Sequence, residues 1–99
     1  MPKSHSYYVY ILLCADSTYY TGVTNNITLR VKQHELAKDP ASYTAQRLPI
    51  KLVWAQQFKY INDAIAWEKR IKRWSKAKKE ALINSEYEKL PLLAKKKFS

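Results

Sequence analysis

Arg30 and His34 have the residue types and the spacing for chemistry on a phosphate group. They stand four residues apart, so they share one face of any helix that contains both. A guanidinium can bind a phosphate, and an imidazole can take or give a proton near neutral pH. The same pair also fits a helix with an exposed arginine and a half-buried histidine, so the pair alone does not decide the function.

Glu68 is a carboxylate at a position that favours an apolar residue. At about 100° per residue, it falls within the apolar arc of its helix. That arc is formed by Ile61, Ala64, Ile65, Trp67, Ile71 and Trp74. Because burying an unpaired carboxylate is costly, Glu68 needs a partner, which can be a divalent cation, the ammonium group of Lys72 or an opening in the core.

The elements that must position these residues predict a small α+β domain. Aromatic and β-branched runs indicate strands over residues 7–14, 19–23 and 51–60. Helices are expected over residues 27–37, from a cap at Asn62-Asp63 to about residue 74, and from a break at Ser75 to residue 83. The order β-β-α-β-α-α predicts a three-stranded antiparallel sheet flanked by helices. The loop over residues 38–47 either lines a DNA groove or is a plain surface loop.

The hairpin and the first helix resemble the GIY-YIG nuclease domains in their small stand-alone bacterial form. The two signature elements of that family appear here as Tyr8-Val9-Tyr10 and Tyr20-Thr21-Gly22. Tyr8 replaces the glycine of the first element and Thr21 the isoleucine of the second, and neither position carries out chemistry in the family. The resemblance covers about residues 7–84.

Further positions of the family pattern fall on residues with suitable chemistry. The family places an arginine ten residues after the second tyrosine, and Arg30 stands ten residues after Tyr20. His34, four residues beyond that arginine, matches the histidine or tyrosine of many members. Glu68 matches a glutamate on a later helix, and Asn84 is the candidate for an asparagine found in some members.

The resemblance implies a metal-dependent DNA endonuclease, a hydrolase of phosphodiester bonds, with DNA repair or processing as its setting. The implied catalytic residues are Tyr10, Tyr20, Arg30, His34 and Glu68, with Gly22 and Asn84 as additional candidates. One Mg²⁺ or Mn²⁺ ion at Glu68 is expected to polarise the scissile phosphate, while Arg30 binds that phosphate and Tyr10 or Tyr20 orients or deprotonates the attacking water. The alternative is a module of the same fold that binds nucleic acid without cutting it.

Tyr10 and Tyr20 can share one site only if the hairpin register places them on the same face of the sheet. Side chains alternate along a strand, so the numbers of paired residues must have an even sum. A regular two- or four-residue loop gives an odd sum, so we expect a three-residue loop or a bulge near Asp16-Ser17. Gly22, the only glycine, is explained either by a positive φ or by the close approach of a backbone or a phosphate.

Basic residues are concentrated in the second half of the chain. The formal net charge is +10, and residues 69–79 hold seven basic residues and no acidic one. These residues are Lys69, Arg70, Lys72, Arg73, Lys76, Lys78 and Lys79. They are expected to bind the DNA backbone by charge without reading the bases, although a solvated helix face explains them as well.

Length and composition limit the remaining possibilities. A chain of 99 residues with 46% hydrophobic residues is expected to form one domain over residues 1–86, followed by a basic tail over residues 87–99. A single cysteine excludes an internal disulfide, and no apolar run has the length of a signal peptide core or a membrane span. We expect a cytoplasmic protein, monomeric or weakly homodimeric, that binds DNA and has neither a membrane partner nor a small-molecule cofactor.

Overall fold

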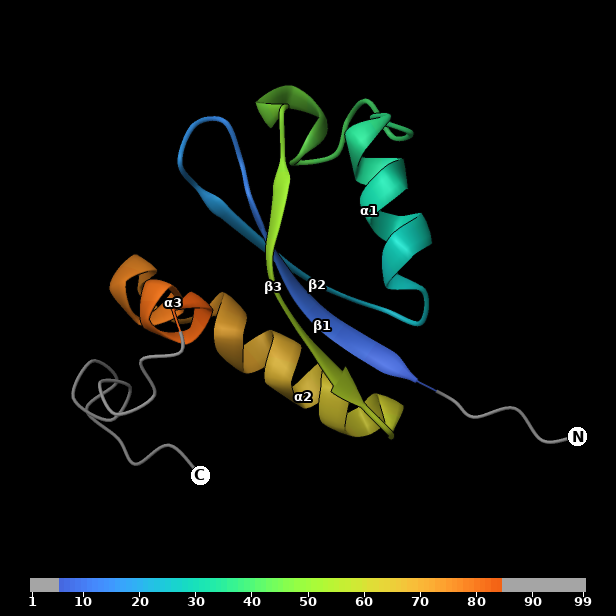
Figure 1. The fold of residues 1–99 in the computed structure, drawn as a ribbon, viewed down its shortest axis with the longest axis vertical. Helices are drawn as coiled ribbons and strands as arrows, with labels where there is room; N and C mark the ends of the chain where they lie inside the picture. Colours follow the sequence, from blue (N-terminus) through green and yellow to red (C-terminus); the bar gives the residue numbers. More distant parts are fainter. Residues whose placement is uncertain (1–5, 85–99) are drawn as a thin grey trace, which may run out of the picture.

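The structure is a computed structural model that describes residues 6–84. Three antiparallel strands form one sheet in the order β2-β1-β3, with β1 (Tyr7–Leu13) between β2 (Tyr19–Thr24) and β3 (Lys51–Phe58). The α+β class and the expected element order are confirmed (Figure 1). The expected tail over residues 87–99, and the end of the domain at residue 86, lie outside the described residues.

A three-residue loop joins β1 to β2. The amide of Cys14 donates to the carbonyl of Thr18 at 2.9 Å, so residues 15–17 form the loop. Ser17 has a φ of 67°, which is the left-handed conformation that often closes such loops. The expectation of a loop with an odd number of residues is therefore confirmed.

The register of this hairpin places the two signature tyrosines on one face. Tyr10 pairs with Gly22, and Leu12 pairs with Tyr20. Tyr10 and Leu12 lie two residues apart on β1, so their side chains point to the same face, and the side chain of Tyr20 points there too. The sheet therefore brings both phenols to a single site.

Two of the three α-helices begin with a side-chain cap. In α1 (Ile27–Glu35), the side chain of Asn26 accepts a hydrogen bond from the amide of Leu29 at 3.1 Å. In α3 (Lys76–Ile83), Ser75 caps the first turn through the amide of Lys78. The expected cap of α2 (Ile61–Lys72) at Asn62-Asp63 is wrong, because both residues lie inside the first turn of the helix, which begins after Tyr60 and has no side-chain cap there. A short 3₁₀ helix, η1 (Ala45–Arg47), lies in the loop before β3.

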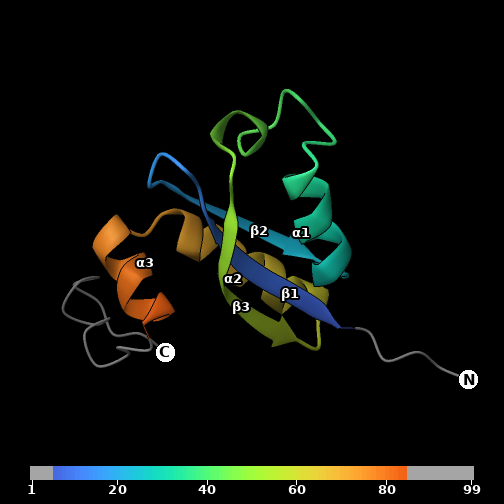
Figure 2. The same ribbon diagram turned by 45° about the horizontal axis from the view of Figure 1, so that its top comes forward.

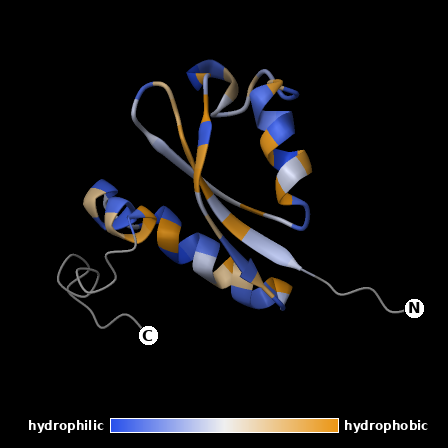
Figure 3. Ribbon diagram, viewed as in Figure 1, coloured by the Kyte–Doolittle hydropathy of each residue, from blue (hydrophilic) through white to orange (hydrophobic). Residues whose placement is uncertain are grey.

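The helices lie on the two faces of the sheet. Val9 and Ile11 of β1 form the buried core with Ala64 and Ile71 of α2 and with Leu82 of α3. Tyr10 alternates with these residues and points to the other face, where α1 lies, and Figures 1 and 2 show α1 and α2 on opposite sides of the strands. In Figure 3, hydrophobic residues colour parts of β1 and β3 and alternate with hydrophilic residues along α2, as expected for a helix with one face buried against a sheet.

No helix within residues 6–84 is both long enough and apolar enough to cross a membrane.

Candidate active site

A chain of three side chains connects β1, α1 and the loop after α1. The hydroxyl group of Tyr10 lies 3.1 Å from Nε2 of His34, and Nδ1 of the same ring lies 2.7 Å from the hydroxyl oxygen of Thr44. Tyr10 and Thr44 are both 0% exposed, and His34 is half-buried. Each nitrogen of the imidazole thus has a fixed hydroxyl partner, which orients the ring from both sides.

Burial changes the pKa values of two of these hydrogen-bonded side chains in opposite directions. It raises the pKa of Tyr10 to about 12, because the phenolate is desolvated and the charge of Tyr20 opposes it, although Arg30 lowers the pKa in part. Burial also lowers the pKa of His34, and the nearby charge of Arg30 lowers it further. Tyr10 therefore holds its proton at neutral pH, while His34 is held in its neutral form and can accept a hydrogen bond.

Tyr20 joins the cluster from the edge strand β2. Its ring centroid lies 6.3 Å from that of Tyr10 and 5.2 Å from that of His34. On its other side it stacks on Tyr43, with centroids 6.0 Å apart and planes inclined by 27°. Tyr20 is half-buried, so of the two signature phenols it is the one with solvent-exposed surface.

Gly22 makes room for the ring of Tyr10. A Cβ atom on Gly22 would lie 2.5 Å from the hydroxyl oxygen of Tyr10 and 2.6 Å from its Cζ, closer than van der Waals contact allows. Its φ is not positive, so its backbone conformation is open to other residues. The sequence offered a positive φ or the close approach of a backbone or phosphate, and the structure instead shows the close approach of a side chain, the ring of Tyr10.

Arg30 stands at the rim of this cluster. It is exposed on α1, one turn before His34, and it is close enough to Tyr10 to lower that pKa through its charge and a hydrogen bond. A guanidinium so placed can bind a phosphate oxygen next to the phenol. Tyr10, Tyr20, Arg30 and His34 are therefore brought together, as the sequence predicted.

Glu68 is nearly buried on α2 and is paired with a lysine. It is 8% exposed, and its Oε2 lies 2.6 Å from Nζ of Lys72, one turn along the helix. The hydrogen bond with Glu68 raises the pKa of Lys72. Lys72 is one of the partners that the sequence allowed, and the carboxylate is near enough to Tyr10 to raise the pKa of that phenol.

The donor set around Glu68 decides which cation fits. Within residues 6–84, no group of three or more His, Cys, Asp or Glu side chains is arranged to hold a metal. Magnesium, however, commonly binds proteins through one or two carboxylates and completes its shell with water and substrate phosphate. The single Glu68 carboxylate, which pairs with Lys72, is a donor of the kind that this mode uses.

The seven basic residues do not all lie on one exposed face. Helix α2 ends at Lys72 and α3 starts at Lys76, so the run is divided between two helices. Lys78 is 7% exposed and its ammonium lies 3.8 Å from the ring centroid of Trp74, while Lys79 is half-buried with a pKa lowered by burial and by Lys72. The exposed members besides Lys72 are Lys69, Arg70, Arg73 and Lys76.

One candidate lies apart from the cluster, and two residues were missed. Asn84 is exposed at the C-terminal end of α3, and among the described residues its side chain makes no hydrogen bond to the cluster. Tyr43 and Thr44 contact the site, yet they lie in a loop with no periodic pattern. The signal available was the hydroxyl-rich run Ser42-Tyr43-Thr44 in a loop already considered as a groove lining.

A protein-family model and several known proteins match this sequence. A model of the GIY-YIG catalytic domain matches residues 6–81. A UPF0213 protein of Natronomonas pharaonis is 45% identical over 80 residues, covering 81% of this chain and 93% of the relative. A UPF0213 protein of Lacticaseibacillus paracasei is 41% identical over 78 residues, covering 79% of this chain and 86% of the relative.

Solved structures agree in fold. The solution NMR structure of a UPF0213 protein from Bacillus halodurans aligns with a TM-score of 0.53 at 40% identity, covering 80% of this chain and 83% of that one. The solution NMR structure of a protein from E. faecalis aligns with a TM-score of 0.58 at 27% identity, covering 88% and 92%. The family model that matches residues 6–81 confirms the sequence resemblance, and the relatives are small proteins like this chain.

Proposed function

Because this chain belongs to the GIY-YIG catalytic domain family, we propose that it is a divalent-metal-dependent DNA endonuclease that acts in DNA repair or processing. The family supports nuclease chemistry on a nucleic acid, whereas the metal, the preference for DNA and the setting are proposals. The observation that carries the proposal is the cluster of Tyr10, Tyr20, Arg30 and His34 with the Glu68 carboxylate in electrostatic reach. A domain that only binds nucleic acid does not require these chemical groups around one point.

Arg30 is the proposed phosphate ligand. It is exposed, and its charge lowers the pKa of Tyr10, so a phosphate that binds Arg30 is placed near the buried phenol. The positive guanidinium also offsets the negative charge that grows on the phosphate as water attacks. In the free protein Tyr10 has no exposed surface, so water reaches its oxygen only after a neighbour moves, and Arg30 turning towards a phosphate is the proposed movement.

Tyr10 is the proposed proton acceptor for the attacking water. Water adds to phosphorus, the water proton passes to the oxygen of Tyr10, and the phenol proton passes to Nε2 of His34. The bond to the leaving 3′ oxygen breaks, and that oxygen takes a proton from solvent water to give a 3′ hydroxyl group. The 3.1 Å contact with neutral His34 supports this direction of transfer. Tyr20, half-buried and next to both rings, orients the water.

Glu68 is the proposed ligand of one Mg²⁺ or Mn²⁺ ion. Such an ion supplies Lewis-acid polarisation of the scissile phosphate and stabilisation of the leaving oxygen. Glu68 presents a single carboxylate, consistent with a hydrated ion that is completed by substrate. Lys72, whose side chain is 53% exposed, is free to leave the carboxylate when the ion arrives.

A cleavage survey separates an endonuclease from a binding module. The wild-type protein is incubated with supercoiled, branched and single-stranded DNA, each with Mg²⁺, with Mn²⁺ and with a chelator. We expect nicks or cuts in at least one DNA with a metal and none with the chelator. Binding of all three DNAs without metal-dependent cleavage would instead support the non-catalytic module.

A further inference from the structure

The hydrogen-bond chain at the site ends on a side chain outside the family signature. Thr44 lies in the loop between α1 and η1, is 0% exposed, and has its hydroxyl oxygen 2.7 Å from Nδ1 of His34. The other ring nitrogen faces Tyr10 at 3.1 Å. A histidine held between two buried hydroxyl groups can adopt either of two tautomers, and the tautomer decides whether Tyr10 gives or receives the hydrogen bond.

Counting protons favours one direction. Tyr10, neutral His34 and Thr44 each carry one polar hydrogen, but only two hydrogen bonds join them. One hydroxyl hydrogen therefore has no acceptor among these three side chains. Arg30 can only donate to Tyr10, which leaves Nε2 of His34 as the acceptor for the phenol hydrogen among the described residues. A phenol is a stronger acid and a stronger donor than an aliphatic hydroxyl. The unprotonated ring nitrogen of His34 therefore accepts from Tyr10 rather than from Thr44.

We propose that Thr44 is a positioning residue whose hydroxyl oxygen accepts the Nδ1 hydrogen of His34 and so holds Nε2 ready to accept the proton of Tyr10. Its role in catalysis rests on the proposed function, whereas the tautomer is a property of the free protein. The arrangement is the one by which many enzymes fix a histidine, since the partner of one ring nitrogen sets the state of the other.

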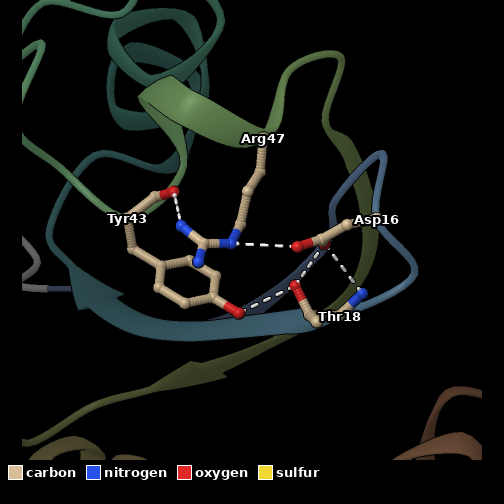
Figure 4. A network of polar contacts seen from close by, with 4 residues as sticks. All are labelled: Asp16, Thr18, Tyr43 and Arg47. Carbon is tan, nitrogen blue, oxygen red and sulfur yellow. Dashed lines mark hydrogen bonds and ion pairs between the residues drawn. The ribbon is translucent and has the colours of Figure 1, made fainter.

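The loop that carries Thr44 is fastened to the hairpin turn. Arg47 donates to Asp16 at 3.0 Å and to the carbonyl of Tyr43 at 2.8 Å, and its guanidinium lies 3.7 Å from the centroid of the Tyr43 ring (Figure 4). The hydroxyl group of Tyr43 donates to Thr18 at 2.8 Å, and Thr18 donates in turn to Asp16. These contacts fix the backbone next to Thr44, so its hydroxyl group is held in place.

The tautomer of His34 can be read by NMR without any activity. The sequence holds two histidines, so ¹⁵N-labelled protein with the substitution His5→Gln gives the imidazole signals of His34 alone. At a pH where His34 is neutral, we expect the two-bond ¹⁵N–¹H pattern of a ring protonated at Nδ1. The pattern of a ring protonated at Nε2 would overturn the proposal.

Three substitutions separate the hydroxyl group from the packing of Thr44. Thr44→Val keeps the volume and removes the hydroxyl, so the Nδ1-protonated form should lose population, and DNA nicking should fall by about tenfold to a hundredfold. Thr44→Ser keeps the hydroxyl and should restore the wild-type tautomer and most of the rate. Thr28→Val, the same change at an exposed position of α1, should alter neither.

Two results contradict the role of Thr44. A Thr44→Val protein with a native backbone amide spectrum and an unchanged tautomer would overturn it, as would one that nicks DNA at the wild-type rate. A wild-type protein that cuts no nucleic acid would refute the proposed nuclease, and the tautomer spectra of the same samples would still decide the hydrogen-bond direction at Thr44.

Discussion

Tyr10 and Tyr20 have the same side chain but different surroundings. Tyr10 is fully buried and hydrogen-bonded to His34, whereas Tyr20 is half-buried and stacked on Tyr43. A proton acceptor needs a route for its own proton, and Tyr10 has one in Nε2 of His34. Removing the hydroxyl group from each tyrosine in turn is therefore expected to reduce the cleavage rate by different amounts.

Tyr10→Phe should abolish the proton transfer and reduce the single-turnover nicking rate by about 10²- to 10⁴-fold. Tyr20→Phe keeps the stack on Tyr43 and should cost less, since it removes only a group that orients water. Quenched-flow cleavage of a supercoiled plasmid measures both rates. A larger loss for Tyr20→Phe than for Tyr10→Phe would reverse the assigned roles.

His34 should make stability depend on pH in acid. Burial and Arg30 lower its pKa below the ordinary value of 6.5, so between the lowered pKa and 6.5 the unfolded chain binds more protons than the folded one. The free energy of unfolding should therefore fall as the pH drops through this window, and above 6.5 the effect should be absent. Urea denaturation at several pH values measures it, with His34→Gln as the variant that lacks the slope. An equal slope in both proteins would show that other groups cause it.

The chemistry of single residues was predictable from the sequence only where a pattern marked them. Glu68 was conspicuous because it interrupts an apolar arc, and it is nearly buried with Lys72 as its partner. Thr44 was not conspicuous, since a loop has no periodicity and its contact with His34 depends on how the chain folds back. Its full burial is visible only in three dimensions.

At the scale of elements, the hairpin register decides whether a site exists. The requirement that Tyr10 and Tyr20 share a face predicted a three-residue loop or a bulge, and the structure has the three-residue loop. The start of α2 was predicted wrongly because Asn62 and Asp63 are good caps in isolation, whereas the strand before them ends early enough for the helix to begin at Ile61. Cap residues set a preference, and the path of the chain out of β3 overrides it.

Gly22→Ala should damage the site through the pairing of β1 with β2. The added methyl group would lie 2.5 Å from the hydroxyl oxygen of Tyr10, so the ring must shift away from His34. We expect at least a tenfold loss of nicking, comparable to that caused by a misplaced catalytic group. A double-mutant cycle checks the cause. In the Tyr10→Phe background the same substitution should cost little further activity, and equal losses in both backgrounds would point to a general disturbance of the sheet.

At the scale of the whole molecule, the excess positive charge is less uniform than the sequence suggested. The run over residues 69–79 is divided between α2 and α3, and Lys78 is buried against Trp74. Arg73 and Lys76 lie exposed on either side of the break between these helices. We expect these exposed cations to carry the sequence-independent part of DNA affinity.

Removing Arg73 and Lys76 together should weaken DNA binding and its dependence on salt. Each lost phosphate contact should reduce the slope of log K against log salt by about one. Fluorescence anisotropy with a labelled duplex at several salt concentrations measures the slope. Lys51→Ala on β3, which removes an exposed cation elsewhere, is the matched control. An unchanged slope in the double variant would place the DNA on another surface.

We propose that hydrolysis at the cluster around Tyr10 depends on Arg30 as the phosphate ligand and on Glu68 as the metal ligand. The most direct test measures Mg²⁺-dependent nicking and DNA binding side by side for wild type, Glu68→Ala and Arg30→Ala. We predict that both variants lose nicking while their DNA affinity stays largely intact, because the exposed cations of α2 and α3 remain. Variants that both cut DNA at the wild-type rate would contradict the account.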